Sequence, residues 1–174
     1  MSIERPRRAI AAVIAAAAVV LPAALAGATP VDVRGAGELQ DLQTATAQPT
    51  DGASAQVTAT VADGGTTVTL KVEGLDHAAA GTVLGAHIHR GTCVAGDGAA
   101  AGPHYNSTGG TVISDQTEVW LDFEVQRNGT GRAETHVPFV IPHGAASAVV
   151  IHAMHTNDTT GAAGPRWACL PVLF

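Results

Sequence analysis

The sequence predicts an all-β protein built around one antiparallel β-sandwich or closed barrel. Apolar and polar residues alternate along several short segments, and turns that contain Gly or Asn separate these segments. Beyond the N-terminal 28 residues, no segment keeps the 3.6-residue apolar period of a helix. The chain has 174 residues, which is enough for one domain with a hydrophobic core.

Residues 1–28 have the pattern of a secretory signal peptide. A basic start that includes Arg7 and Arg8 precedes an apolar run over residues 9–21, and small residues follow, with cleavage expected after Ala26 or Ala28. The run is too short, and too soon ended by proline, for a membrane anchor. The paired arginines leave twin-arginine export open beside ordinary secretion. We therefore expect a secreted, cell-envelope or periplasmic protein with no membrane attachment after cleavage.

The charge of the chain excludes several kinds of partner. Cleavage would remove three Arg and one Glu, a net charge of +2, and would change the formal net charge from -6 to -8. Lys71 is the only lysine, and aromatic residues make up 3% of the chain. This composition argues against nucleic acids and anionic membranes as partners. An anionic substrate would need a local positive charge to offset the overall field.

Residues 29–53 are rich in Ala, Thr, Gly, Gln and Asp and show little periodicity. We expect a flexible linker there, with at most one short strand near residues 39–42. The folded domain is then expected over residues 54–174.

The strands of this domain follow from the alternation. A β-hairpin is expected first, with strands around residues 57–61 and 68–72 joined by the turn Asp63-Gly64-Gly65. Further strands are expected around residues 87–89, 119–125, 132–140, 147–153 and 168–173. Residues 91–115 form a long loop, of the length that is usually functional or disordered.

Histidines on these elements suggest a metal site. His87 and His89 point to one face of their strand and Ile88 to the other, so the pair could supply half of a copper or zinc site. A solvated strand face with two polar residues explains the pair as well. His104 in the long loop and His152 at the end of an apolar strand would complete a four-nitrogen site that suits Cu(II).

Cys93 and Cys169 are the only cysteines. In an exported protein they are expected to form one disulfide. The alternative, two free thiols that bind copper, stays open at this point.

Four motifs, in this order, carry a resemblance to a known family: Gly85-Ala86-His87-Ile88-His89, Gly102-Pro103-His104-Tyr105-Asn106, Val149-Val150-Ile151-His152-Ala153 and Gly164-Pro165-Arg166-Trp167-Ala168-Cys169. Over residues 55–174 the chain resembles the copper/zinc superoxide dismutases. The resemblance implies a Greek-key β-sandwich, or flattened barrel, with His87, His89, His104 and His152 as copper ligands. It also implies that Cys93 and Cys169 form the disulfide within the subunit, and that Arg166 attracts and orients superoxide beside the copper.

The chain departs from the two-metal members of that family. No histidine lies between His104 and His136, where those members have two zinc ligands. Asp115 is not assigned as the zinc-binding aspartate, and His136 lies on the wrong strand. A zinc site needs about four ligands, so we expect copper without zinc, as in the copper-only branch.

The second loop, residues 154–165, is short. Within it, Asp158 is either an acceptor for a copper-binding histidine or a solvated loop residue, and His155 is a less favoured ligand. We expect His77, His136 and His143 on the surface or at strand edges.

These expectations lead to a secreted superoxide dismutase that converts superoxide to oxygen and hydrogen peroxide at a single copper. The competing hypothesis is a non-enzymatic copper-binding or copper-buffering protein on the same fold, and a third is an interaction module that kept only the barrel. The sequence does not predict the oligomeric state.

Overall fold

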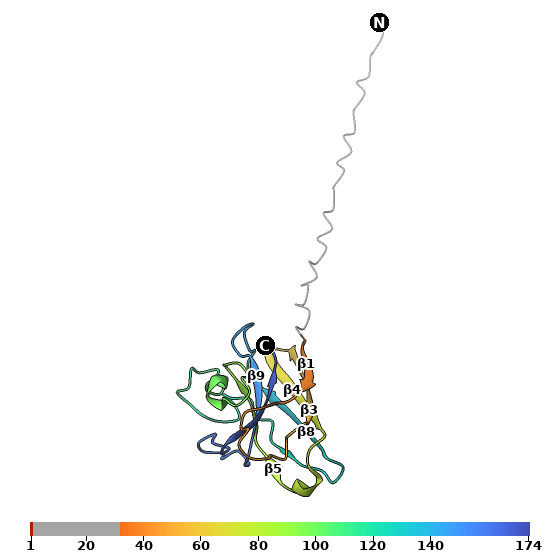
Figure 1. The fold of residues 1–174 in the computed structure, drawn as a ribbon. Coiled ribbons are helices and arrows are strands. Elements are labelled where there is room, and N and C mark those ends of the chain that lie inside the picture. The colour runs from red at the N-terminus through yellow and green to blue at the C-terminus, as the bar shows by residue number, and fades with distance from the viewer. Residues whose placement is uncertain (2–31) are drawn as a thin grey trace.

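The computed structural model describes Met1 and residues 32–174, so the expected signal peptide over residues 1–28 lies, Met1 aside, outside the described residues. Within the described part, the chain forms strands, two short 3₁₀ turns and no α-helix (Figure 1). The strands are β1 (Val33–Glu38), β2 (Gln40–Asp41), β3 (Ser54–Ala62), β4 (Gly65–Glu73), β5 (Val83–Leu84), β6 (Ala86–His89), β7 (Phe123–Glu124), β8 (Thr130–Val137), β9 (Ala148–His152) and β10 (Arg166–Pro171). The turns are η1 (His77–Ala79) and η2 (Gly98–Ala101).

Two four-stranded antiparallel sheets form the framework. The first sheet has the strand order β1-β3-β4-β8, and the second sheet has the order β2-β10-β9-β6. Strands β5 and β7 form a separate antiparallel pair. In the first sheet, β4 and β8 are neighbours, although β6 of the second sheet lies between them in sequence. In the second sheet, β6 and β9 are neighbours, although β8 of the first sheet lies between them in sequence. Such connections between sheets are of the Greek-key kind. The all-β prediction is therefore confirmed.

The hydrophobic core lies between the two sheets. Period-two alternation along β3 and β4 turns one face of each strand inward, so that Val57 and Leu70 are 1% and 0% exposed. Ile88, Ile151 and Leu170 enter the same cluster from the second sheet. The hairpin of β3 and β4 with its turn at Asp63 and Gly64 is as the sequence predicts.

The short strand expected near residues 39–42 is present as β2, but the flexible linker expected over the rest of residues 29–53 is wrong from Val33 onward. Strand β1 pairs with β3 in the first sheet, and β2 pairs with β10 in the second, so this segment passes from one sheet to the other. Gly35 lies so close to Val172 that a side chain at this position would have no room. Leu39 and Leu42 are buried at the crossing. The alternation is weak here because β1 is an edge strand whose other side chains are mostly exposed.

The expected strand over residues 119–125 is shorter than predicted. Only Phe123–Glu124 pairs as a strand, although Val119, Leu121 and Val125 are buried as the alternation requires. The residues before it bond to β6 instead, with the Leu121 N–H donating to the Ala86 carbonyl at 2.7 Å. This shift places residues 118–122 beside the histidine strand.

No helix among the described residues is long and apolar enough to cross a membrane.

Candidate metal centre

The first two histidines lie on β6. Side chains alternate along a strand, so Ala86 and Ile88 enter the core while His87 and His89 share the opposite face. Both histidines are fully buried, although they point away from the core. The prediction that their imidazoles share one face is confirmed, and the alternative of a solvated strand face is wrong.

His152 and His104 complete the group. His152 is the last residue of β9, which is the neighbour of β6 in the second sheet. His104 forms a β-bridge with His89, so the long loop follows the edge of β6 that β9 leaves open. One ring nitrogen from each of the four histidines lies within 4.8 Å of the others. All four predicted ligands are therefore in one place.

Backbone carbonyls fix which nitrogen of His89 and His152 is protonated. Nδ1 of His89 lies 3.1 Å from the carbonyl oxygen of Gly102, and Nδ1 of His152 lies 3.3 Å from that of Gly164. A carbonyl oxygen can only accept, so each Nδ1 carries the hydrogen and each Nε2 carries a lone pair. These two Nε2 atoms face each other at 3.2 Å. Two lone pairs do not bond to each other, whereas a cation would bind both.

A buried carboxylate holds His104. Nδ1 of His104 donates to Oε2 of Glu118 at 2.8 Å, and Nε1 of Trp120 donates to the same oxygen at 3.0 Å. Nδ2 of Asn106 donates to Oε1 of Glu118 at 3.3 Å. Burial by itself raises the pKa of Glu118, but these hydrogen bonds outweigh it and the pKa is lowered. Glu118 therefore stays an acceptor, and Nε2 of His104 is left with the lone pair.

The fourth imidazole is held by a hydroxyl. Nε2 of His87 lies 2.7 Å from Oγ1 of Thr156. The other ring nitrogen, Nδ1, is buried and has no hydrogen-bond partner. A buried polar atom without a partner is costly, and a metal ion is one of the groups that would satisfy it. Each of the four histidines thus has one nitrogen bound to the protein and one free, which is the donor set that Cu(II) prefers.

Burial also keeps three of these imidazoles neutral, those of His87, His89 and His152. Desolvation is the largest cause of lowered pKa values in the group: it brings the pKa of His89 to about 2 and that of His152 to about 4, and holds the pKa of His87 well below its usual value. The charge of Arg166 acts in the same direction. The hydrogen bond from His89 to the Gly102 carbonyl, and at His152 the hydrogen bond to the Gly164 carbonyl together with the charge of Asp122, oppose this lowering without cancelling it. The neutral form is the one that binds a metal, so protons compete little for these nitrogens near neutral pH.

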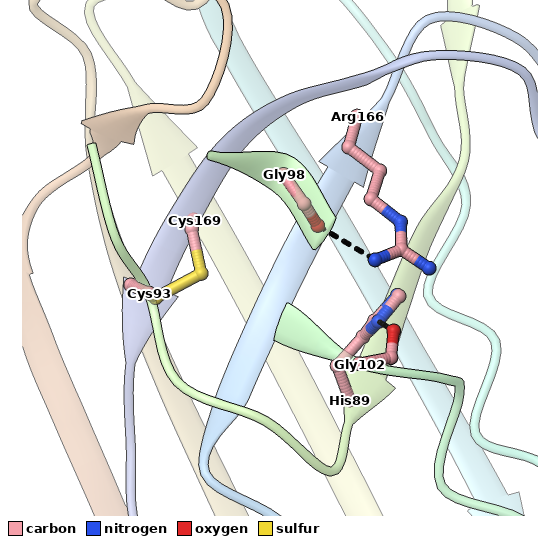
Figure 2. The surroundings of a disulfide bond; sticks show 6 residues. All are labelled: His89, Cys93, Gly98, Gly102, Arg166 and Cys169. Carbon is pink, nitrogen blue, oxygen red and sulfur yellow. Dashed lines mark hydrogen bonds between the residues drawn. A yellow bond between two sulfur atoms is a disulfide. The ribbon is translucent and has the colours of Figure 1, made fainter. Parts of the chain in front are cut away.

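Arg166 lies beside the histidines. It begins β10 directly opposite His152 on β9, and its Nη1 donates to the carbonyl of Gly98 at 2.7 Å (Figure 2). Burial lowers the pKa of Arg166, but a guanidinium remains a cation at neutral pH. An open surface depression adjoins it, lined by Gly98, Ala99, Gly102, Pro103 and Arg166. A small anion that enters this depression would meet a fixed positive charge.

The predicted disulfide between Cys93 and Cys169 is present. The alternative of two free thiols as copper ligands is therefore wrong. The bridge ties the long loop to β10 three residues after Arg166, and the same loop supplies the Gly98 carbonyl that holds the guanidinium (Figure 2). It thus connects the loop and the strand whose relative position fixes Arg166.

Other residues considered from the sequence lie apart from the cluster. Asp115 and Asp158 are exposed. His155 is also exposed, and its Nε2 lies 3.6 Å from Oδ2 of Asp122 rather than among the four ligands. The remaining histidines are exposed, as expected: His77, His136 and His143.

Sequence reasoning missed the polar residues that support the four histidines. These residues are Glu118, Trp120 and Asp122. They alternate along the chain with the buried apolar residues Val119 and Leu121. They therefore share the face opposite the core, and Trp120 forms a β-bridge with His87. The same alternation that predicts the apolar face could have identified these residues as a polar face beside the histidine strand.

Comparison with known families gives one match. The family model described as copper/zinc superoxide dismutase (SODC) matches residues 52–171, which is well over half of the chain. A comparison with curated protein sequences finds no match. The extent of the family match agrees with the sheet topology and the histidine cluster described above. The chain belongs to the copper/zinc superoxide dismutase family.

Proposed function

We propose that the protein is a secreted superoxide dismutase that holds a single copper ion with His87, His89, His104 and His152. The observation that carries this proposal is the convergence of four imidazoles, three buried and one half-buried, each with one nitrogen held by the protein and the other free. Bound copper would supply the one-electron couple by which two superoxide ions and two protons become oxygen and hydrogen peroxide.

Arg166 is proposed to guide the substrate. The described chain is acidic overall, so an approaching anion is repelled unless a local charge reverses the field. The guanidinium is held at the edge of the cluster by Gly98, and one edge of it remains available to an anion in the open depression. A protein that only stores copper has no need of such a charge, and this favours the enzyme over the copper-buffering alternative.

Glu118 supports the copper-only form of the site. In two-metal members a zinc ion would bind the second nitrogen of the histidine at this position, whereas here a carboxylate accepts a hydrogen bond from Nδ1 of His104. Among the described residues, the four histidines are the only group of three or more His, Cys, Asp or Glu side chains placed to share a metal. We therefore propose that zinc has no site of its own and that His104 binds copper alone.

Secretion is proposed on two grounds. Residues 1–28 have the pattern of a signal peptide, and the Cys93–Cys169 disulfide suits an oxidising compartment.

Two measurements test this function. Metal analysis of the copper- and zinc-exposed protein should find about one copper and no stoichiometric zinc per chain, as expected for one set of about four ligands. The copper-loaded protein should accelerate superoxide disproportionation, and Arg166→Ala should lower the rate constant about tenfold at low ionic strength and less at high ionic strength.

Arg127→Ala is the matched control, because it removes the same charge from an exposed turn away from the cluster. Its rate should stay near that of the unaltered protein. A copper-loaded protein with no activity above that of buffer would contradict the enzyme and leave copper buffering as the function.

A further inference from the structure

The loop after β9 reaches into the metal centre through Thr156. This residue is 1% exposed, and its Oγ1 lies between two polar groups: Nε2 of His87 at 2.7 Å and Oδ1 of Asp122 at 2.6 Å. Asp122 also accepts the N–H of Thr156 at 2.8 Å and that of Ala86 at 3.3 Å. A single carboxylate thus bonds to the loop and to the strand that carries His87.

The hydrogens of this chain can be assigned. The Thr156 hydroxyl has one hydrogen, and it donates this hydrogen to Asp122, because a carboxylate only accepts. Towards His87 the hydroxyl oxygen can then only accept, so Nε2 of His87 carries a hydrogen. The lone pair of the ring is left on Nδ1, the atom that is buried and without a partner.

We propose that Thr156 is a positioning residue, which together with Asp122 fixes the tautomer and orientation of His87 for metal binding. The proposal rests on the proposed function in that His87 is taken as a copper ligand. The other three imidazoles are each held directly by a carbonyl or a carboxylate. His87 alone is held through an intermediate hydroxyl, and that hydroxyl belongs to the short second loop.

This arrangement makes the second loop part of the copper site, although the loop supplies no ligand. The hydroxyl is the link between Asp122 and the imidazole, so its removal would take one hydrogen bond from the carboxylate and leave Nε2 of His87 without its partner. The loop backbone would still be tied to Asp122 through the N–H of Thr156. A variant that lacks only the hydroxyl should therefore disturb the orientation of His87 and leave the loop anchored to Asp122.

The test compares Thr156→Val, Thr156→Ser and Thr159→Val with the unaltered protein. Valine keeps the shape of threonine without the hydroxyl, serine keeps the hydroxyl, and Thr159 is an exposed threonine of the same loop. Copper affinity is measured by competition with a chelator, and the Cu(II) electron paramagnetic resonance spectrum reports ligand geometry. Nitrogen-15 NMR of the metal-free protein reports which nitrogen of His87 is protonated.

Thr156→Val should lower copper affinity about 10- to 100-fold, as is typical when a partner of a metal-binding histidine is lost. Its Cu(II) spectrum should change, and Nε2 of His87 should no longer be the uniformly protonated nitrogen. Thr156→Ser should stay within about threefold of the unaltered affinity, and so should Thr159→Val. A folded Thr156→Val with unaltered affinity and an unaltered tautomer would overturn the proposal.

The metal-free NMR measurement on the unaltered protein is decisive even if Thr156→Val does not fold. A hydrogen on Nε2 of His87 supports the assignment, and a hydrogen on Nδ1 overturns it. These readouts do not depend on dismutation. An inactive copper-loaded protein that shows the expected tautomer and affinities would therefore contradict the proposed enzyme and leave the role of Thr156 standing.

Discussion

The two sheets differ in regularity, and the difference separates scaffold from site. In the first sheet, β3 and β4 are each nine residues long and keep one register along their whole length. In the second sheet, β6 and β9 have four and five residues, and the register of β10 shifts between Arg166 and Ala168. The first sheet carries none of the four proposed ligands, whereas the second carries three of them.

The short strands explain how a buried polar site is tolerated. Where a strand ends, the chain can turn back and place carbonyls, carboxylates and hydroxyls around the side chains it has just aligned. Four residues outside the named strands supply the polar groups that hold the histidine rings: Gly102, Glu118, Thr156 and Gly164. Changes in the first sheet are therefore expected to alter stability, and changes around the second sheet to alter the metal site as well.

The largest expected effect comes from the disulfide, because it acts on both the stability of the fold and the metal site. Replacement of Cys93 and Cys169 by serine should lower the free energy of unfolding by about 4 kcal/mol, because the bridge closes a long loop. It should also lower the dismutation rate, since the loop that holds Arg166 through Gly98 is released. Urea unfolding and the activity assay measure the two effects. A stable variant with full activity would show that the loop is held by other contacts.

Leu70→Ala in the first sheet should affect stability alone. Leu70 is fully buried at the centre of β4, and truncation should cost about 3 kcal/mol in the free energy of unfolding. Copper affinity of the folded variant should not change. Lys71→Ala, at the next and exposed position, is the control and should stay within about 0.5 kcal/mol. Loss of copper affinity in folded Leu70→Ala would contradict the separation of the sheets.

The second sheet should make the metal-free protein sensitive to acid. His89 and His152 have pKa values of about 2 and 4 in the folded state, below the usual 6.5, so the unfolded chain binds more protons between these values. Stability should therefore fall as the pH drops below about 6.5, by about 1.4 kcal/mol for each residue between pH 7.5 and 5.5. The lowered pKa of His87 acts in the same direction.

Urea unfolding of the metal-free protein at both pH values measures this effect. Bound copper should reduce the loss, because it favours the folded state in which the imidazoles are neutral. Equal stability at pH 7.5 and 5.5 without metal would show that the imidazoles are not kept neutral by the fold.

The smallest expected effect concerns the charge of the carboxylate that holds His104. Glu118→Gln keeps an acceptor for Nδ1 of His104 but removes the charge, so copper affinity should fall about tenfold, the low end for partners of metal-binding histidines. Chelator competition measures this, with the exposed Glu124→Gln as the control. If Glu118→Gln bound stoichiometric zinc together with copper, the copper-only proposal would be wrong.

The same contrast explains what the sequence could predict. Long strands with one buried face, such as β3 and β4, show their alternation directly, and the His87–His89 pair follows from it. Strand β1 was missed because its place depends on backbone pairing with β3 and on the close approach of Gly35 to Val172, neither of which has a local pattern.

The supporting residues of the site were missed for a different reason. Glu118 and Asp122 lie on the polar face of a segment that was predicted as a strand from its apolar residues alone. Thr156 is one of several threonines in its loop, and only the folded chain shows that it alone among them is buried. The four proposed ligands follow from the histidine positions and from the family motifs around them, whereas the groups that orient them depend on contacts between distant segments.

The crossing from β1 to β2 has a consequence for the order of folding. The partner of β2 is β10, which is the last strand in chain order, whereas β2 is the second. The second sheet therefore cannot be completed until β10 has been synthesised, and until then β2 has no strand to pair with. Contacts so distant in sequence slow folding, and until they form, the edges of β2 and β10 are open to pairing with other chains.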